Sequence, residues 1–249
     1  TENNFNAKQL KKLGKKIINT CYIYEDKLIT GSIERIKDIN IIPSPYLTGA
    51  LDHSFQLPLI PMIETTRGCP FTCTFCADGL DIKSKINRYE SQRTREELQL
   101  IAKNINKVDE LIVTDLNFGM YKQDMETAKE IANIQKNYNY PISVDAPAGK
   151  NMPKRIINIA SIMKGWSMGG VIQSSDPDVL KAIKRSNISI SAYQDLIDFG
   201  NKQKANRTYT EIILGLPSDT KKRHFESLRL GVEKSVNNLR MHQAMLLTG

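Results

Sequence analysis

The sequence predicts an α/β fold in which six parallel strands alternate with helices and curl into a partial (β/α)6 barrel. The main observation is that short apolar, β-prone runs alternate with segments whose apolar residues recur every three to four positions. A second is size, since 249 residues, 40% of them hydrophobic, suffice for one large core. Because parallel neighbours cannot be joined by hairpins, the helical crossovers imply a parallel sheet with right-handed connections.

The expected strands are the apolar runs at residues 59–65, 111–114, 142–146, 168–173, 209–214 and 239–247. Helices between them are indicated by five apolar sets, which begin at Leu98, Met125, Ile156, Val179 and Phe225. The fourth set continues through Ile197 and predicts a single helical stretch. The chemistry of such sheets gathers at the carboxyl ends of the strands, so the loops that follow the strands should carry the site.

The N-terminal part of the chain differs from this alternation. Residues 5–19 predict a basic amphipathic helix, and a short β-prone stretch follows around residues 22–36. Two prolines within residues 41–47 fix φ and predict an extended crossing before the core. We therefore expect a small N-terminal accessory region of helix and linker, residues 1–57, followed by the barrel core, residues 58–249.

Composition narrows the function classes. The formal net charge of +8 would suit a polyanionic partner such as RNA, but the basic residues are spread along the chain, which favours a solvated basic surface. No apolar run is long enough to cross a membrane and no secretory leader is evident, so a cytoplasmic location is expected. Serine-hydrolase, phosphate-loop and zinc-protease motifs are absent from the sequence, and its three histidines share no ligand spacing.

The cysteines carry the strongest chemical signal. Cys69, Cys73 and Cys76 lie within eight residues directly after the first core strand, whereas Cys21 is far away. This spacing is a poor disulfide framework and is typical of a metal or cluster loop. A cubane iron–sulfur cluster normally takes four thiolates, so three would leave one iron open to an amine and a carboxylate of a small molecule.

Two other uses of the three thiols remain open at this point. One is a structural zinc site completed by Cys21, His53 or Asp78, although zinc sites usually pair their cysteines at shorter, repeated spacings. The other is a plain electron-transfer cluster. Either would make the chain a non-catalytic interaction module rather than an enzyme.

The Cys-x3-Cys-x2-Cys spacing with an aromatic residue, Phe75, before the last cysteine resembles the signature of the radical S-adenosylmethionine (radical SAM) superfamily. The resemblance covers about residues 59–247. It implies a [4Fe-4S] cluster, held by the three cysteines, that cleaves S-adenosylmethionine reductively to a 5′-deoxyadenosyl radical acting on a small-molecule substrate. It further implies an external electron donor such as flavodoxin or ferredoxin.

A more specific resemblance concerns the segment 42–49, Ile-Pro-Ser-Pro-Tyr-Leu-Thr-Gly, upstream of Arg67-Gly-Cys-Pro. It is similar to the subgroup that often carries an N-terminal cobalamin-binding domain. That domain is not within these 249 residues, so cobalamin is a hypothesis about a longer protein. The basic composition leaves tRNA modification by the same radical chemistry as an alternative.

The resemblance also implies cofactor-binding residues at the ends of the second and third strands. Asp115 and Asn117 stand where the family binds the amino group of S-adenosylmethionine, although Thr114–Gly119 departs from the family's glycine-glycine-glutamate form. Asn117 is equally a turn-former. Asp145 resembles an acidic position that bonds the ribose hydroxyls, with a cap as the alternative.

Further candidates follow the fourth and fifth strands. Gln173 and Ser175 resemble family positions that contact the ribose or the methionine moiety, and Arg185 resembles an arginine that pairs with the carboxylate. Asp176 before Pro177 favours a helix N-cap and is left out of the site. The segment 211–217 resembles the apolar stretch that lies against adenine. Lys150 could reach an anionic substrate, but exposed lysines usually have no specific role.

Overall fold

The computed structural model describes residues 14, 16–203 and 207–245. The chain separates into two compact units, Thr1–Asp38 and Ile39–Gly249. In the first, β1 (Cys21–Tyr24) pairs antiparallel with β2 (Lys27–Thr30) through a tight turn. The helix expected over residues 5–19 lies mostly outside the described residues, and residues 16–19 at its end are not helical. The assignment of 1–57 and 58–249 as separate domains stays a prediction.

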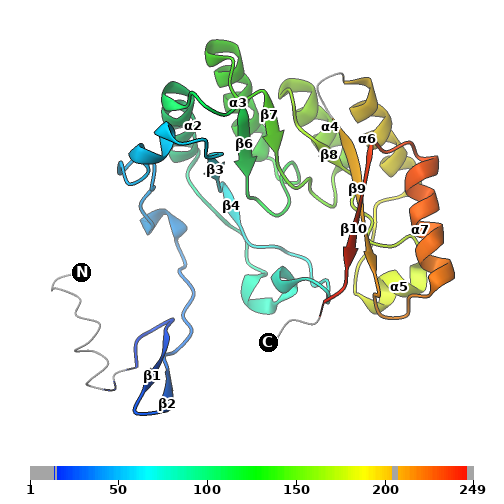
Figure 1. The fold of residues 1–249 in the computed structure, drawn as a ribbon, viewed down its shortest axis with the longest axis horizontal. Coiled ribbons are helices and arrows are strands. Elements are labelled where there is room, and N and C mark those ends of the chain that lie inside the picture. The colour runs from blue at the N-terminus through cyan, green and yellow to red at the C-terminus, as the bar shows by residue number, and fades with distance from the viewer. Residues whose placement is uncertain (1–13, 15, 204–206, 246–249) are drawn as a thin grey trace. The chain divides into compact units, whose positions relative to one another are not determined.

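The second unit contains six parallel strands in chain order (Figure 1). One group of three is β3 (Met62–Ile63), β6 (Glu110–Val113) and β7 (Ser143–Asp145). The other is β8 (Met168–Gly169), β9 (Thr208–Leu214) and β10 (Asn238–Gln243). A parallel bridge between Val144 and Trp166 joins the two groups, and we call this junction the seam. Among the described residues β3 and β10 do not pair, so the predicted partial barrel is confirmed.

The helices follow the strands as the periodicity predicts. They are α2 (Ser91–Asn104), α3 (Asp124–Tyr138), α4 (Pro153–Ile162), α5 (Pro177–Ala182), α6 (Ile190–Lys202) and α7 (Lys221–Glu233). The single helical stretch expected from Val179 to Ile197 is wrong, because Lys184 takes a left-handed φ of 51° after α5. Ser189 then caps α6 by accepting from the N–H of Ala192 at 3.2 Å. None of the described helices is long and apolar enough to span a membrane.

The linker before β3 departs from the extended form that its prolines predict. Residues 45–50 form turns, because the Ser44 hydroxyl accepts from the N–H of Leu47 at 3.1 Å. These turns bring the buried Tyr46 against β3, where its hydroxyl donates to the Met62 carbonyl and accepts from the Met62 N–H. The linker thereby satisfies backbone groups on the edge strand of the sheet.

Candidate functional site

The three cysteines of the motif lie on a tightly folded loop, residues 68–86, which we call the cysteine loop. It leaves β4 (Thr66–Arg67) and returns in β5 (Asn87–Arg88), and the two short strands pair antiparallel. Gly68 has a φ of 110°, and a Cβ there would stand 2.3 Å from the Lys85 carbonyl oxygen. A Cβ on Gly79 would approach the Cys73 carbonyl oxygen just as closely. Only glycine fits at both positions, so the sequence allows the loop to close on itself.

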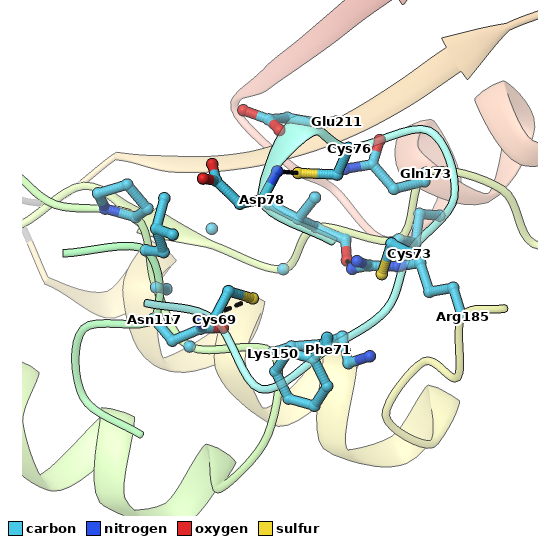
Figure 2. A pocket seen from close by; sticks show the side chains of 18 of the residues that line it. Cys69, Phe71, Cys73, Cys76, Asp78, Asn117, Lys150, Gln173, Arg185 and Glu211 are labelled. Carbon is cyan, nitrogen blue, oxygen red and sulfur yellow. Dashed lines mark hydrogen bonds between the residues drawn. The ribbon is translucent and has the colours of Figure 1, made fainter. Parts of the chain in front are cut away.

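All three cysteines line one cavity of about 200 Å³ (Figure 2). Cys73 is buried, Cys69 is half-buried and Cys76 is exposed. The Cys69 sulfur accepts a hydrogen bond from Asn117 Nδ2 at 3.5 Å, and the Cys76 sulfur accepts one from the Asp78 N–H at 3.4 Å. Within the part of the chain that the structure describes, no three histidine, cysteine, aspartate or glutamate side chains are grouped as they would be around a metal ion.

The carboxyl ends of successive strands supply the opposite wall, as the parallel topology predicts. Leu116 and Asn117 come from the loop after β6, and residues 147–150 from the loop after β7. Residues 169–173 contribute β8 and the segment that follows it, and Glu211 comes from β9. The cavity is therefore mostly apolar with a few convergent polar groups, which is the usual character of a small-molecule site.

Among the described residues that line the cavity, Gln173 carries a buried polar atom without a hydrogen-bond partner. Its φ of 63° is unusual for a residue other than glycine, and its backbone forms a parallel bridge with Ile212 of β9. The residue is 7% exposed, and its Oε1 atom is buried without a hydrogen-bond partner. Because buried acceptors are rarely left unpaired, this oxygen fits a donor carried by a bound molecule.

Two cations flank the thiols. Arg185 donates from Nη2 to the Val171 carbonyl at 2.5 Å and from Nε to Asn187 Oδ1 at 3.0 Å. Burial lowers its pKa, and the adjoining Cys73 side chain opposes that shift. Lys150 Nζ lies 3.7 Å from the centroid of the Phe71 ring, and burial lowers its pKa against the opposing effect of Cys73. Both cations therefore stand in the wall of the cavity that the three cysteines line.

The candidates predicted from sequence divide into two groups. Phe75, Asn117, Gln173 and Arg185 line the cavity together with the three cysteines. Asp115, Asp145 and Ser175 are not in its wall.

The polar groups of Asp115 and Ser175 have partners within the protein. The Asp115 carboxylate accepts the N–H groups of Thr65 and Thr66 at 2.7 and 3.1 Å and also bonds the Thr65 hydroxyl. The Ser175 hydroxyl lies 3.1 Å from that of Ser227. Asp115 therefore supports the backbone at Thr65 and Thr66, and Ser175 contacts α7 through Ser227.

Sequence reasoning missed the Glu211 side chain, because the segment from 211 to 217 was interpreted as an apolar stretch. A usable signal was the single charge in the β-prone run of β9, where Glu211 stands between Thr210 and Ile212, both fully buried in the structure. Alternation along a strand puts such a residue on the face opposite to its neighbours. That face is the one that lines the cavity.

The buried Asp115 predicts a pH dependence of stability. Burial raises the pKa of this carboxyl from 3.8 to about 6, against the opposing hydrogen bonds from Thr65 and Thr66. The folded state therefore binds the proton more tightly than the unfolded chain, so this stabilisation is complete below about pH 4 and is lost as the pH rises through 6. The rise in pKa from 3.8 to about 6 corresponds to about 3 kcal/mol in the free energy of unfolding.

The measurement is urea unfolding of the wild type and Asp115→Asn at several values between about pH 4 and pH 7. Asparagine at position 115 cannot titrate. As the pH rises through this range, the free energy of unfolding of the variant should therefore increase by about 3 kcal/mol relative to that of the wild type. Parallel stability curves for the two proteins would contradict the prediction.

The three thiols fit an iron–sulfur cluster, in which each thiolate binds a different iron, although in the described residues they are not grouped as they would be around a single metal ion. The donor set comes from one closed loop, and an orphaned acceptor and two cations stand around the same cavity. A cluster held in this way keeps one iron without a protein ligand, and the apolar wall leaves room for a small molecule beside it.

Comparison with known proteins gives an independent result. Residues 63–230 match the model of the radical SAM superfamily. The cobalamin-dependent radical SAM methyltransferase TokK of Streptomyces tokunonensis is 33% identical over 207 residues, which are 78% of this chain and 30% of TokK. The 2-(S-pantetheinyl)-carbapenam-3-carboxylate methyltransferase of Streptantibioticus cattleyicolor is 33% identical over 190 residues, which are 72% of this chain and 27% of that enzyme.

The fold is also found among solved structures. The radical S-adenosylmethionine methyltransferase TsrM of Kitasatospora setae superposes with a TM-score of 0.60 at 12% identity, over 76% of this chain and 37% of TsrM. The chain spans less than a third of the length of either curated relative described above.

Proposed function

The chain belongs to the radical SAM superfamily, and on this premise we propose that Cys69, Cys73 and Cys76 hold a [4Fe-4S] cluster whose open iron binds S-adenosylmethionine. When bound, this pair supplies one-electron cleavage of the cofactor to a 5′-deoxyadenosyl radical that abstracts hydrogen from a substrate. The observation that carries the proposal is the cavity in which the three thiols and the unpaired Gln173 oxygen meet.

The chain's own residues then have distinct tasks. Asn117 donates to the Cys69 sulfur and thereby orients it toward the cavity. Two of the Arg185 nitrogens are engaged by the protein, and its remaining donors can pair with the methionine carboxylate. Gln173 accepts from an amino or ribose hydroxyl group of the cofactor. Phe75 and Leu116 provide apolar surface that excludes water from the cavity.

We extend the proposal to the longer protein. Both curated relatives are named as methyltransferases, one of them cobalamin-dependent. A cobalamin-assisted methyl transfer to a small organic molecule is therefore the reaction that we propose. Enzymes of this family act on a substrate and need a source of electrons; flavodoxin or ferredoxin is our proposed source here.

The first test is formation of 5′-deoxyadenosine by this chain after anaerobic reconstitution with iron and sulfide. With dithionite and S-adenosylmethionine present, we expect the product to accumulate, and omission of either should abolish it. Chromatography with mass detection measures the product, and iron analysis measures loading of about four irons per chain. A fully loaded protein that forms no 5′-deoxyadenosine would contradict the proposal. Stoichiometric zinc without iron after anaerobic purification would favour the non-catalytic alternative.

A further inference from the structure

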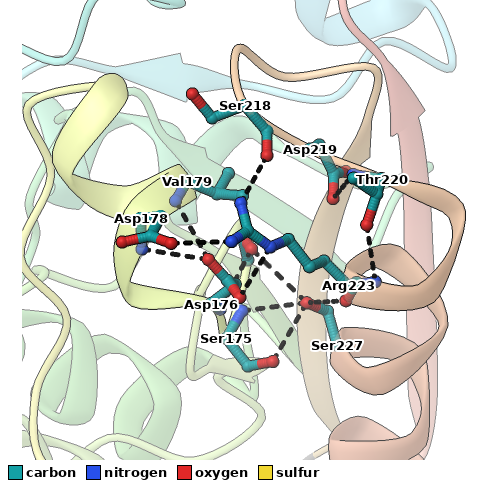
Figure 3. A network of polar contacts seen from close by, with 10 residues as sticks. Ser175, Asp176, Asp178, Val179, Ser218, Asp219, Thr220, Arg223 and Ser227 are labelled. Carbon is teal, nitrogen blue, oxygen red and sulfur yellow. Dashed lines mark hydrogen bonds and ion pairs between the residues drawn. The ribbon is translucent and has the colours of Figure 1, made fainter.

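The short helix α5 is held at its N-terminal end by Arg223 of α7 (Figure 3). Asp176 caps α5 by accepting from the N–H groups of Asp178 and Val179 at 2.9 and 3.1 Å. The Arg223 guanidinium bonds Asp178 Oδ2 at 2.6 Å and lies 3.2 Å from Asp176 Oδ2. Its Nη1 also donates to the Ser218 carbonyl at 2.7 Å. One planar fork therefore joins the start of α5 to the loop before α7.

A second attachment lies one turn further along α7. The hydroxyl of Ser227, which is 1% exposed, accepts from the Ser175 N–H at 2.9 Å and donates to the Arg223 carbonyl at 3.1 Å. The segment that leads into α5 is thus fixed through its backbone as well as through its side chains. Gln173 lies two residues before Ser175, in the cavity wall.

The other end of α5 supports the cysteine loop. The Ile183 carbonyl, directly after the helix, accepts from the N–H of Thr74 at 3.1 Å. Phe75, which lines the cavity, packs against the buried cluster that contains Val179 and Ile183. A displacement of α5 would therefore move a backbone contact and an apolar contact of the loop that carries the three thiols.

We propose that Arg223 is a positioning residue of the cofactor cavity. It lines no part of the cavity itself, and it acts by fixing α5 so that Gln173 and Phe75 keep their places. The inference rests on the proposed function, because it assumes that S-adenosylmethionine is the ligand of the cavity. Arg223 and Asp178 are 31% and 68% exposed, so their ion pair adds little to global stability. The expected defect is therefore in ligand binding rather than in folding.

The test compares Arg223→Gln with a matched control on the same helix. Arg229 pairs with Glu226 and Glu233 along the exposed side of α7, so Arg229→Gln removes equal charge without touching α5. Calorimetric titration of the reconstituted, unreduced chain with S-adenosylmethionine gives the dissociation constant. The electron paramagnetic resonance spectrum of the reduced cluster, with and without S-adenosylmethionine, reports the geometry at the open iron.

We expect Arg223→Gln to raise the dissociation constant about tenfold, within the range known for residues that act at a distance. Iron content and melting temperature should match those of Arg229→Gln, whose dissociation constant should equal that of the wild type. Arg223→Lys, which keeps the charge but not the fork, should recover part of the affinity. The spectral change on adding S-adenosylmethionine should be altered only in the Arg223 variants.

A dissociation constant for Arg223→Gln within twofold of the wild-type value would overturn the proposal, and so would an equal loss in Arg229→Gln. If Arg223→Gln fails to load iron, the Asp178→Asn variant replaces it in the test, because it removes only the exposed contact between Asp178 and the Arg223 guanidinium. An unchanged dissociation constant for S-adenosylmethionine in Asp178→Asn would count against the inference. Wild-type protein that binds S-adenosylmethionine but forms no 5′-deoxyadenosine contradicts the proposed function alone. Wild-type protein that binds none contradicts both proposals.

Discussion

Replacing Cys73 with alanine should remove the iron–sulfur cluster and, with it, all cleavage of S-adenosylmethionine. Cys73 is 6% exposed and is the middle thiol of the motif, between Cys69 and Cys76. With only two thiolates left, a cubane would have two irons without a protein ligand. We expect iron to fall from about four to below about one per chain and 5′-deoxyadenosine formation to fall at least about 100-fold. Loss of a metal ligand should weaken cluster binding more than loss of a residue that only hydrogen-bonds such a ligand.

The matched control is Cys21→Ala. Cys21 is exposed on the β1–β2 hairpin, in the other compact unit, and should change neither iron content nor product formation. Circular dichroism of both variants shows whether the fold survives. Full iron and full activity in Cys73→Ala would refute the assignment of the three thiols, whereas an equal loss in Cys21→Ala would point to general damage by cysteine removal.

The periodicity of the sequence predicted regular strands well, but it predicted poorly the strand ends that line the cavity. The strand expected at 209–214 is found as β9, Thr208–Leu214. By contrast, the strand expected at 168–173 is found only as Met168–Gly169 and an isolated parallel bridge from Gln173 to Ile212, and residues 170–172 between them line the cavity. Local patterns fail at such positions because the site, rather than the sheet, determines the backbone.

The same contrast holds for the candidate residues. Three cysteines in eight residues form one local motif, so their placement on a single loop follows from the sequence alone. The surroundings of Asp115 depend on Thr65, 50 residues away, and those of Ser175 on Ser227, 52 residues away. No local pattern encodes partners at that separation. Asp115 therefore bonds backbone N–H groups and Ser175 bonds the Ser227 hydroxyl, and neither lines the cavity.

Replacing Trp166 with alanine should cost about 3–5 kcal/mol in the free energy of unfolding, the usual range for a large aromatic residue in a core. Trp166 is fully buried at the seam, where its backbone bridges to Val144. Its Nε1 donates to the Ala146 carbonyl at 2.9 Å, and its ring meets Phe118 edge-on at 5.4 Å between centroids. The substitution therefore leaves a cavity and an unpaired carbonyl between the two groups of strands.

Urea unfolding followed by circular dichroism measures this loss, because Trp166 is the single tryptophan and fluorescence would disappear with it. Trp166→Phe keeps the aromatic packing but not the hydrogen bond, so it should cost less than alanine. The indole also stands 3.2 Å from the position of a Cβ on Gly119, in the loop that carries Asn117. The seam therefore supports the loop whose Asn117 donates to the Cys69 sulfur. At a temperature where the Trp166→Ala variant remains folded, we expect it to bind iron less tightly than the wild type. A loss below about 1 kcal/mol would mean that the two groups of strands hold together without the indole.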